Sequence, residues 1–424
     1  MTIVFTHMMP VGFTVEIVIW ATGLVMNKGK SSLYCNSVDN QVLMDLELIT
    51  EMKRGQVPFT YLGVTVSPKR LAVMDCNRLV DNVVDRIRGL GSRKLSYAGR
   101  TVLIQSVLST LHSYWARIFI LPKTVISKIE AICRSYLWHG SDSKESPALV
   151  SWENACKPIK QGGLGFKHLH CWNVAAVGKY VWWVAKKADH LWVRWVHSIY
   201  IKNCNWMDYE PGSGSSWAWR KICQVKHLMK PLFLSLSGLE QYTIKAGYQW
   251  IKPDGNLVPW YPWMLNKWLI PRQAFIVWLI AHQKLLTQDR LIRMHIISEN
   301  KCFLCGLQEE NLNHLFLECS FSRHCSDMVS EWSCFRFPMQ QIIRWWIDWR
   351  QASACKKKII AMILASLMYH IWHSRNCSWI EGYVFRPQVI AARVKHDVQS
   401  RLAQCSIRSK NASVLAWVAH IRCN

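Results

Sequence analysis

The sequence predicts a mainly α-helical protein with a short β-hairpin and one small metal-binding segment. Apolar residues recur at three- and four-residue steps along much of the chain, which is the period of a helix with one buried face. Half of the 424 residues are hydrophobic and only 19% are charged, a balance typical of ordered globular protein. The length exceeds that of one usual domain, so two or three cooperating units are expected.

Residues 57–140 are expected to form a hairpin followed by a bundle of three helices. β-branched and aromatic residues run from 57 to 66 and are bounded by Pro68, which predicts the hairpin. Helical periodicity follows over residues 71–90, 98–115 and 122–140, and the short connections predict a small bundle. The apolar residues assigned to the buried faces are Leu79, Val80, Val83, Val84, Ile87, Leu90, Leu103, Ile104, Val107, Leu108, Leu111, Trp115, Val125, Ile126, Ile129, Cys133, Tyr136 and Leu137.

Beyond residue 140, helical stretches alternate with loops. The turn Gly162-Gly163-Leu164-Gly165 lacks the Lys-Ser or Lys-Thr of a phosphate-binding loop, so it predicts a tight turn. Helical periodicity runs from about Trp172 to Tyr200, and Pro211-Gly212-Ser213-Gly214-Ser215-Ser216 is the strongest linker signal, where we expect a boundary. An apolar run over 260–280 and a helix with Leu285, Leu286 and Leu291 then lead into a cysteine cluster.

The charge balance predicts an acidic partner. Lys and Arg outnumber Asp and Glu by 52 to 27, a formal charge of +25, and both nucleic acid and an anionic membrane surface would attract that charge. Residues 61–140 hold twelve Lys or Arg against four Asp or Glu. The candidate phosphate contacts are Lys69, Arg70, Arg93, Lys94 and Arg100. The alternative is that these side chains only solvate the outer faces of the bundle.

A membrane span or signal peptide is not expected. The apolar stretch from Met8 to Met26 contains Pro10 and Glu16 and breaks at Thr22-Gly23, whereas a span needs about 20 uninterrupted apolar residues. It also lacks a basic start and a clear cleavage site. We therefore expect an intracellular protein, in the nucleus or cytoplasm, with no membrane partner.

Three of the sixteen cysteines and one of the sixteen histidines stand together as candidates for metal binding. Cys302, Cys305, His314 and Cys319 have the spacing C-x2-C-x8-H-x4-C, and three thiolates with one imidazole favour Zn²⁺. A full shell of four leaves no position for a catalytic water, so the site is expected to be structural. Chance proximity of buried cysteines is the alternative, and His324 or Cys325 could replace a ligand.

The 24 tryptophans admit two explanations. Core and interhelix packing is the favoured one, and platforms for unpaired bases are the other. The spacing alone does not separate them.

The chain resembles the carboxy-terminal part of the reverse transcriptase of plant non-LTR (LINE-type) retrotransposons. Each shared motif is weak alone, and their common order carries the resemblance. The motifs are Gly23-Leu24-Val25-Met26-Asn27-Lys28-Gly29-Lys30-Ser31, Pro58-Phe59-Thr60-Tyr61-Leu62-Gly63-Val64, Leu95-Ser96-Tyr97-Ala98-Gly99-Arg100, Leu103-Ile104-Gln105-Ser106-Val107-Leu108, Gly162-Gly163-Leu164-Gly165, Ser216-Trp217-Ala218-Trp219-Arg220-Lys221-Ile222, Leu286-Thr287-Gln288-Asp289-Arg290-Leu291, His314-Leu315-Phe316-Leu317-Glu318-Cys319 and Ile371-Trp372-His373-Ser374-Arg375-Asn376.

The resemblance implies a division of the chain into five parts. Residues 1–66 look like the end of a polymerase palm, and 67–140 like the helical thumb that holds primer and template. Residues 141–250 would be a helical connector, 256–330 a reverse-transcriptase-type zinc-binding domain, and 331–424 a carboxy-terminal helical region.

One departure from the family bears on enzymology. These polymerases carry adjacent aspartates just before the segment that Gly23 opens, because phosphoryl transfer needs carboxylates to hold two divalent cations. No Asp-Asp dipeptide occurs in this sequence, and the stretch before Gly23 is too short and apolar for that turn. We expect no polymerisation by this chain alone, and a solvating role for Lys30.

The function expected from the sequence is therefore that of a truncated retroelement product that binds RNA or DNA through phosphates. Alternatives are a zinc-stabilised scaffold that docks a protein partner, and an inert retroelement relic. No residue pattern in the sequence indicates an enzyme of another class. The preference for RNA or DNA, the oligomeric state and a partnership with a complete reverse transcriptase stay open.

Overall fold

A computed structural model describes most of the chain, in two compact units. The described residues are 32–34, 39–56, 58–61, 64–66, 72–89, 95–113, 115–140, 148–235, 241–252, 255–264, 266–336, 353–407 and 411–423. Unit 1 comprises Met1–Asp85, Leu111–Ile129 and His170–Lys252, and unit 2 comprises Arg86–Thr110, Glu130–Leu169 and Pro253–Asn424. The segment from Met8 to Met26 lies outside the described residues. No helix in the described ranges is both long enough and apolar enough to cross a bilayer.

The amino-terminal part of unit 1 holds the strands. β1 (Ser32–Leu33) pairs in parallel with β2 (Lys53–Arg54), and α2 (Asn40–Thr50) lies between them in sequence. β3 (Phe59–Tyr61) and β4 (Val64–Val66) pair antiparallel, with Phe59 opposite Val66. This is the hairpin that the β-branched run predicted.

The three helices predicted after the hairpin are present. They are α3 (Asn77–Gly89), α4 (Tyr97–Ser113) and α6 (Lys123–His139), with the short helices η2 (Met74–Cys76) and α5 (Trp115–Ile118) beside them. The predicted apolar positions are buried wherever their side chains are described, except Val84, which is half-buried. The mainly α-helical fold class is therefore confirmed.

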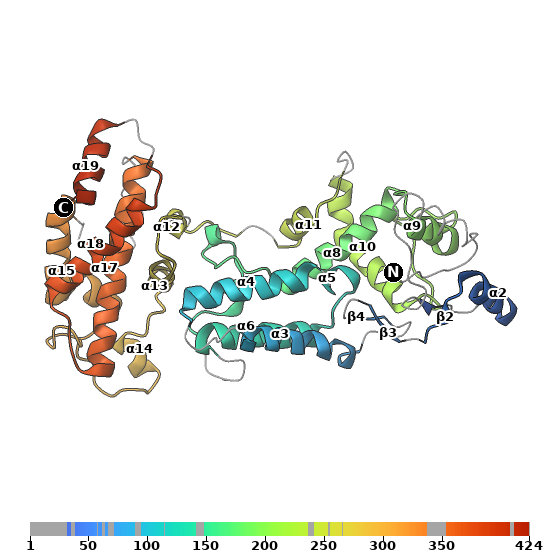
Figure 1. Cartoon of the computed structure of the whole chain (residues 1–424), viewed down its shortest axis with the longest axis horizontal. Helices are drawn as coiled ribbons and strands as arrows, with labels where there is room; N and C mark the ends of the chain where they lie inside the picture. Colours follow the sequence, from blue (N-terminus) through green and yellow to red (C-terminus); the bar gives the residue numbers. More distant parts are fainter. Residues whose placement is uncertain are drawn as a thin grey trace. The chain divides into compact units, whose positions relative to one another are not determined.

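The rest of unit 1 is a group of helices (Figure 1), and these helices pack around an aromatic core. Its elements are α8 (Leu169–Ala185), α9 (Leu191–Val196), the π-helix η5 (His197–Ile201), α10 (Trp217–Ser235) and α11 (Ile244–Ile251). The single helical stretch expected from 172 to 200 is interrupted after α8, where Lys187 adopts φ +48°. The expected boundary at 211–216 lies inside unit 1, where the Ser216 hydroxyl accepts a hydrogen bond from the Trp219 N–H at the start of α10.

Tryptophans fill this aromatic core. Trp182, Trp206 and Trp219 are buried, and the Trp219 ring stacks on Tyr200 at 5.0 Å between centroids. These rings are covered by protein, so for them core packing is the explanation that the structure supports. The Lys226 ammonium is also fully buried here and donates to the Trp206 and Tyr209 carbonyls.

Unit 2 is built around a bundle in which α13, α15, α17 and α18 pack together (Figure 1). Its elements after residue 150 are α7 (Trp152–Ala155), η4 (Ile159–Gln161), α12 (Tyr261–Met264), α13 (Pro271–Ala281), α14 (Gln288–Arg293), the π-helix η6 (His314–Glu318), α15 (Ser320–Ser333), α17 (Ala354–Glu381), α18 (Pro387–Ala403) and α19 (Ala412–Cys423). Sixteen residues of α17 are buried, on every side of the helix. That central helix positions the metal-binding segment described below.

The glycine turn at 162–165 is a close-packed corner of unit 2. The Trp278 indole and the His282 ring meet the Gly162 carbonyl oxygen at 2.8 and 2.6 Å. A Cβ on Gly163 would lie 1.9 Å from the Lys157 carbonyl oxygen, so only glycine fits. The turn serves packing, as predicted.

Candidate metal centre

The first two candidate ligands lie in a tight turn. Cys302 and Cys305 flank Phe303-Leu304, and the chain reverses when the Gly306 N–H donates to the Cys302 carbonyl at 2.7 Å. Gly306 has φ +69°, a left-handed conformation that glycine adopts without strain. The N–H groups of Leu304 and Cys305 donate to the Cys302 sulfur. The turn therefore holds two sulfurs together and supplies donors that stabilise a thiolate.

The second pair of ligands is brought together by a π-turn. In an α-helix, residues five apart point about 140° away from each other. Here η6 closes with a hydrogen bond from the Cys319 N–H to the His314 carbonyl at 2.7 Å, five residues back. This wider turn puts His314 and Cys319 on the same side, which explains the x4 spacing between them.

The four side chains form one compact ligand group. Their ligand atoms all lie within 4.8 Å of one another. The Cys302 and Cys319 sulfurs are 3.9 Å apart, and the Cys305 sulfur is 3.4 Å from the His314 Nε2. A tetrahedral zinc ion would separate sulfurs by about 3.8 Å and sulfur from nitrogen by about 3.5 Å. The donor set and its spacing therefore fit one tetrahedral ion.

Burial makes a bound cation necessary for the charged form of this group. Cys302, His314 and Cys319 are at most 3% exposed. Donation from the Cys302 thiol, together with the Phe321 and Ser322 N–H groups at the start of α15, lowers the pKa of Cys319 to about 5, although burial opposes this. The same shared proton raises the pKa of Cys302.

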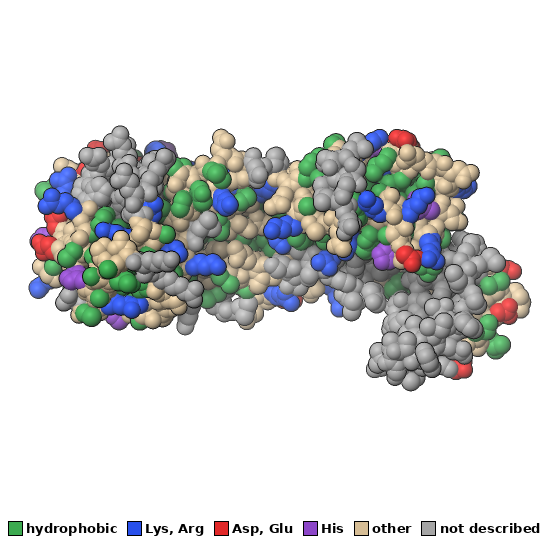
Figure 2. Space-filling view, turned by 90° about the horizontal axis from the view of Figure 1, so that it is seen from above, with side chains coloured by type: hydrophobic (Ala, Val, Ile, Leu, Met, Phe, Trp, Pro, Cys, Tyr) green, Lys and Arg blue, Asp and Glu red, His purple; other side chains and the backbone are tan. Residues whose placement is uncertain are grey.

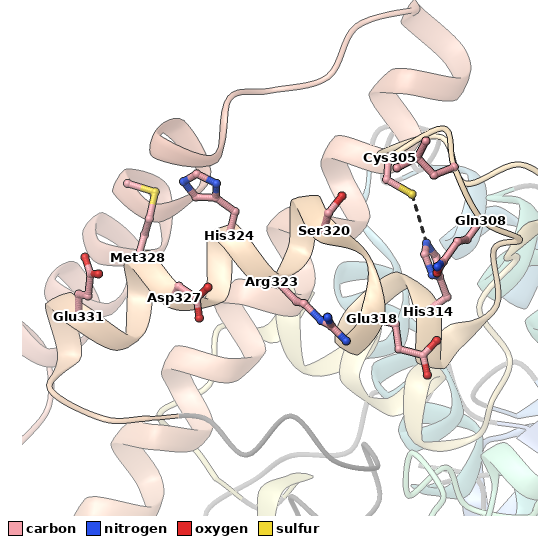
Figure 3. Close-up of a pocket in the computed structure, with 11 residues that line it drawn as sticks. Cys305, Gln308, His314, Glu318, Ser320, Arg323, His324, Asp327, Met328 and Glu331 are labelled. Carbon is pink, nitrogen blue, oxygen red and sulfur yellow. Dashed lines mark hydrogen bonds between the residues drawn. The ribbon is translucent and has the colours of Figure 1, made fainter.

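The two competing ligands lie outside the group. Cys325 is fully buried in α15, and burial raises the pKa of its thiol to about 12. His324 is exposed on α15 and lines a groove of about 800 Å³ that also reaches Cys305 and His314 (Figure 3). Among the residues that the structure describes, only the four predicted ligands form a metal-ligating cluster.

A hydrogen-bond network fixes the turn to its neighbours. The Gln288 side-chain amide bonds both the N–H and the carbonyl of Lys301. The Gln288 N–H donates to a Glu310 carboxylate oxygen at 3.0 Å, and the Glu310 N–H donates to the Asn300 side chain at 2.8 Å. The motif Leu286-Thr287-Gln288-Asp289 therefore holds the segment that carries Cys302.

A buried ion pair joins the metal-binding segment to α17. Arg375 and Glu310 are both fully buried, with Nη2 and Oε1 2.7 Å apart. The Arg375 guanidinium also lies 5.0 Å from the Phe303 ring centroid, inside the metal-binding turn, and 5.1 Å from those of Trp372 and Trp379. The sequence motif 371–376 was noted for its resemblance, but its contact with Glu310 had no local signal.

The candidate phosphate contacts are mostly undescribed. Lys69, Arg70, Arg93 and Lys94 lie outside the described residues. Arg100 is half-buried on α4, donates to the Leu137 carbonyl at 3.2 Å and lies 5.2 Å from the Tyr97 ring centroid. Its guanidinium therefore takes part in packing, and its role toward phosphate stays a prediction.

The described part of the chain is mainly helical and carries a ligand group of three cysteines and one histidine, the donor set of a structural zinc site. Residues 242–325 match the family described as zinc-binding in reverse transcriptase, and this range contains all four ligands. The chain is 27% identical over 211 residues to an Arabidopsis thaliana protein provisionally named as a ribonuclease H protein, a match covering 48% of this chain and 32% of that relative. It is also 27% identical over 142 residues to an uncharacterized mitochondrial protein of the same plant, covering 33% of this chain and 92% of that relative.

These matches confirm the predicted resemblance to reverse-transcriptase proteins of retroelements. The chain spans about a third of the length of the first relative and nearly all of the second. The predicted zinc-binding range of 256–330 overlaps the matched range, which begins earlier, at residue 242. The finer division into palm, thumb and connector stays a prediction.

Proposed function

We propose that this chain is a nucleic-acid-binding part of a non-LTR retroelement reverse transcriptase, folded around a structural zinc ion. It holds RNA or DNA mainly through phosphates. The proposal rests on the distribution of positively charged residues along the chain. Residues 61–140 hold twelve Lys or Arg against four acidic residues, and residues 353–424 hold eleven against two.

The zinc-binding segment itself is nearly balanced. Residues 256–336 hold eight Lys or Arg and seven Asp or Glu. Because nonspecific attraction to phosphate depends on excess positive charge, most contacts to the nucleic-acid strand are expected in the flanking helices. Figure 2 displays Lys and Arg side chains distributed over the face that it draws, with few acidic ones between them. The zinc ion then has a folding role.

Zinc is the resident ion in this proposal. Three thiolates and one imidazole within 4.8 Å fill a tetrahedral shell. Purified protein should contain about one zinc per chain, and Cys302→Ser should lose it. Cys325→Ser, which changes an equally buried cysteine outside the group, is the matched control and should keep its zinc. Equal zinc content in both variants would remove Cys302 from the ligand set.

The proposal assigns no phosphoryl-transfer chemistry to these residues. The sequence contains no Asp-Asp dipeptide of the kind that the resembled polymerases carry. Paired carboxylates are what the two-metal mechanism requires. Support for a binding role therefore comes from charge and not from a catalytic site.

Salt dependence tests the binding proposal. Labelled single strands and duplexes of RNA and DNA would be titrated with the full chain at 50 and 200 mM salt. Contacts to about three to five phosphates should weaken single-strand binding roughly 20- to 100-fold between these conditions. An affinity that does not change with salt concentration, or no binding at the lower salt concentration, would contradict the proposal.

A further inference from the structure

A second basic feature lies in the carboxy-terminal bundle of unit 2, away from the metal ligands. A surface cleft of about 540 Å³ opens where α13, α17 and α18 meet. Two arginines line it, Arg272 from α13 and Arg393 from α18. His370, His373 and His396 also line it, together with one carboxylate, that of Asp397. Positive groups thus outnumber negative ones inside the cleft.

That single carboxylate is already occupied by partners within the protein. Asp397 Oδ2 accepts from the His370 Nε2 at 2.8 Å and from the Gln273 side chain at 2.7 Å, and the Ser366 hydroxyl is 3.3 Å away. Its Oδ1 is 3.8 Å from the Arg272 guanidinium. The acid is 13% exposed and its role is to tie three helices together. Because Asp397 is the one acidic residue among the described ones that line the cleft, Arg393 has no carboxylate partner there.

Aromatic rings hold the two guanidinium groups at the cleft. The Arg393 guanidinium lies 4.1 Å from the Phe385 ring centroid, and that of Arg272 lies 5.2 Å from the Tyr369 centroid. Stacking of this kind leaves the edge of a guanidinium free to donate to an anion. Both arginines stay partly exposed, and the side chain of Arg272 is 49% exposed. Each can therefore reach a bound group.

Two of the histidines at the cleft are held in a partly dehydrated setting. His370 is 94% buried, and its Nδ1 has no hydrogen-bond partner within the described part of the chain, although its Nε2 meets Asp397. Buried polar atoms rarely lack a partner. Burial, and after it the charge of Arg393, lowers the pKa of His373.

We propose that this cleft binds a backbone phosphate of a nucleic-acid strand, with Arg272 and Arg393 as the charged contacts. The inference rests on the proposed nucleic-acid binding and gives it a location in unit 2. Guanidinium groups donate two hydrogen bonds to phosphate in a fixed geometry.

The test uses the full chain and the double variant Arg272→Gln/Arg393→Gln. Its matched control is Arg386→Gln/Lys395→Gln, which removes two charges at the start of and within α18 from side chains that do not line the cleft. Loss of two phosphate contacts should weaken single-strand binding roughly 10- to 30-fold at about 0.1 M salt and flatten the salt dependence. The control should lose much less.

Two further arms separate the outcomes. Arg272→Lys/Arg393→Lys keeps the charge and should recover part of the affinity, and circular dichroism would verify that each variant folds. If the cleft and control variants bind strands equally, or if only inorganic phosphate binds in the cleft, the inference is overturned while the proposed function stands. If the wild-type protein binds no nucleic-acid strand, the result contradicts the proposed function itself.

Discussion

At the scale of single residues, Arg375 is the side chain whose loss should harm the fold most. It is fully buried, pairs with Glu310 and lies against three aromatic rings. Removing one partner leaves an unpaired buried charge, so Arg375→Leu should lower the free energy of unfolding by about 3–5 kcal/mol.

Urea unfolding would measure that loss. The control is Arg194→Leu, because the Arg194–Asp189 pair is 66% and 84% exposed and should contribute less than about 1 kcal/mol. A small, equal effect of both substitutions would show that the buried pair does not stabilise the fold. The double variant Arg375→Leu/Glu310→Leu should recover part of the lost stability, because it removes both charges.

Buried histidines predict how stability changes with pH. Burial lowers the pKa of His282 even though its hydrogen bond to the Gly162 carbonyl opposes the shift, and burial also lowers the pKa of His170. In the unfolded chain these rings take up a proton near pH 6.5, whereas in the folded chain they stay neutral to lower pH. Below about pH 6.5 the unfolded state therefore binds more protons, and stability falls.

The urea midpoint should accordingly be lower at pH 5.5 than at pH 7.5. His282→Gln keeps a donor for the Gly162 carbonyl but cannot titrate, so its midpoint should change less between the two conditions. The difference between variant and wild type isolates this ring from the pH dependence of metal binding. A wild-type midpoint that rises on acidification would refute the assignment.

At the scale of elements, the metal-binding turn depends on its glycine. Gly306 has φ +69°, and a Cβ added there would meet no atom within 4 Å, so Gly306→Ala introduces backbone strain alone. We expect about 1 kcal/mol of lost stability and a roughly fivefold weaker zinc affinity. Gly214→Ala is the control, because that position is equally open and its φ is not positive. Competition with a chelator would measure the affinity.

Periodicity predicted elements better than it predicted their interruptions. The three helices between residues 77 and 139 follow their apolar spacing closely, because one face of each is buried. The break after α8 depends on one left-handed residue, Lys187, which carries no glycine signal. The grouping of the four candidate ligands was predictable because their spacing is typical of a metal site. The π-turn at His314 explains that spacing but has no sequence signature of its own.

Contacts between distant side chains could not be predicted. The Arg375–Glu310 pair joins residues 65 apart, and the Gln273–Asp397 hydrogen bond joins residues 124 apart. Each residue type is usually exposed, and only the arrangement of α13, α17 and α18 makes burial favourable through pairing. The cleft lined by Arg272 and Arg393 likewise depends on residues that are far apart in the sequence. No local pattern indicated it.

At the scale of the whole molecule, metal removal should affect unit 2 selectively. The ligand group is linked to α14 through Gln288 and Glu310 and to α17 through Arg375, whereas unit 1 has its own aromatic core. Hydrogen exchange after chelation should therefore rise over 288–319 and 371–382 and stay unchanged in α8 and α10. Uniform acceleration across both units would contradict this division.

The Arg375–Glu310 pair also sets an order of events during synthesis. Glu310 leaves the ribosome 65 residues ahead of the arginine that neutralises it. Until then the nascent metal-binding segment can gather its four ligands but cannot bury its own carboxylate, because no other cation approaches Glu310 among the described residues. The metal-binding segment therefore cannot complete its folding until the second half of α17, which carries Arg375, has been synthesised. This differs from the general tendency of chains to fold from the amino terminus onward.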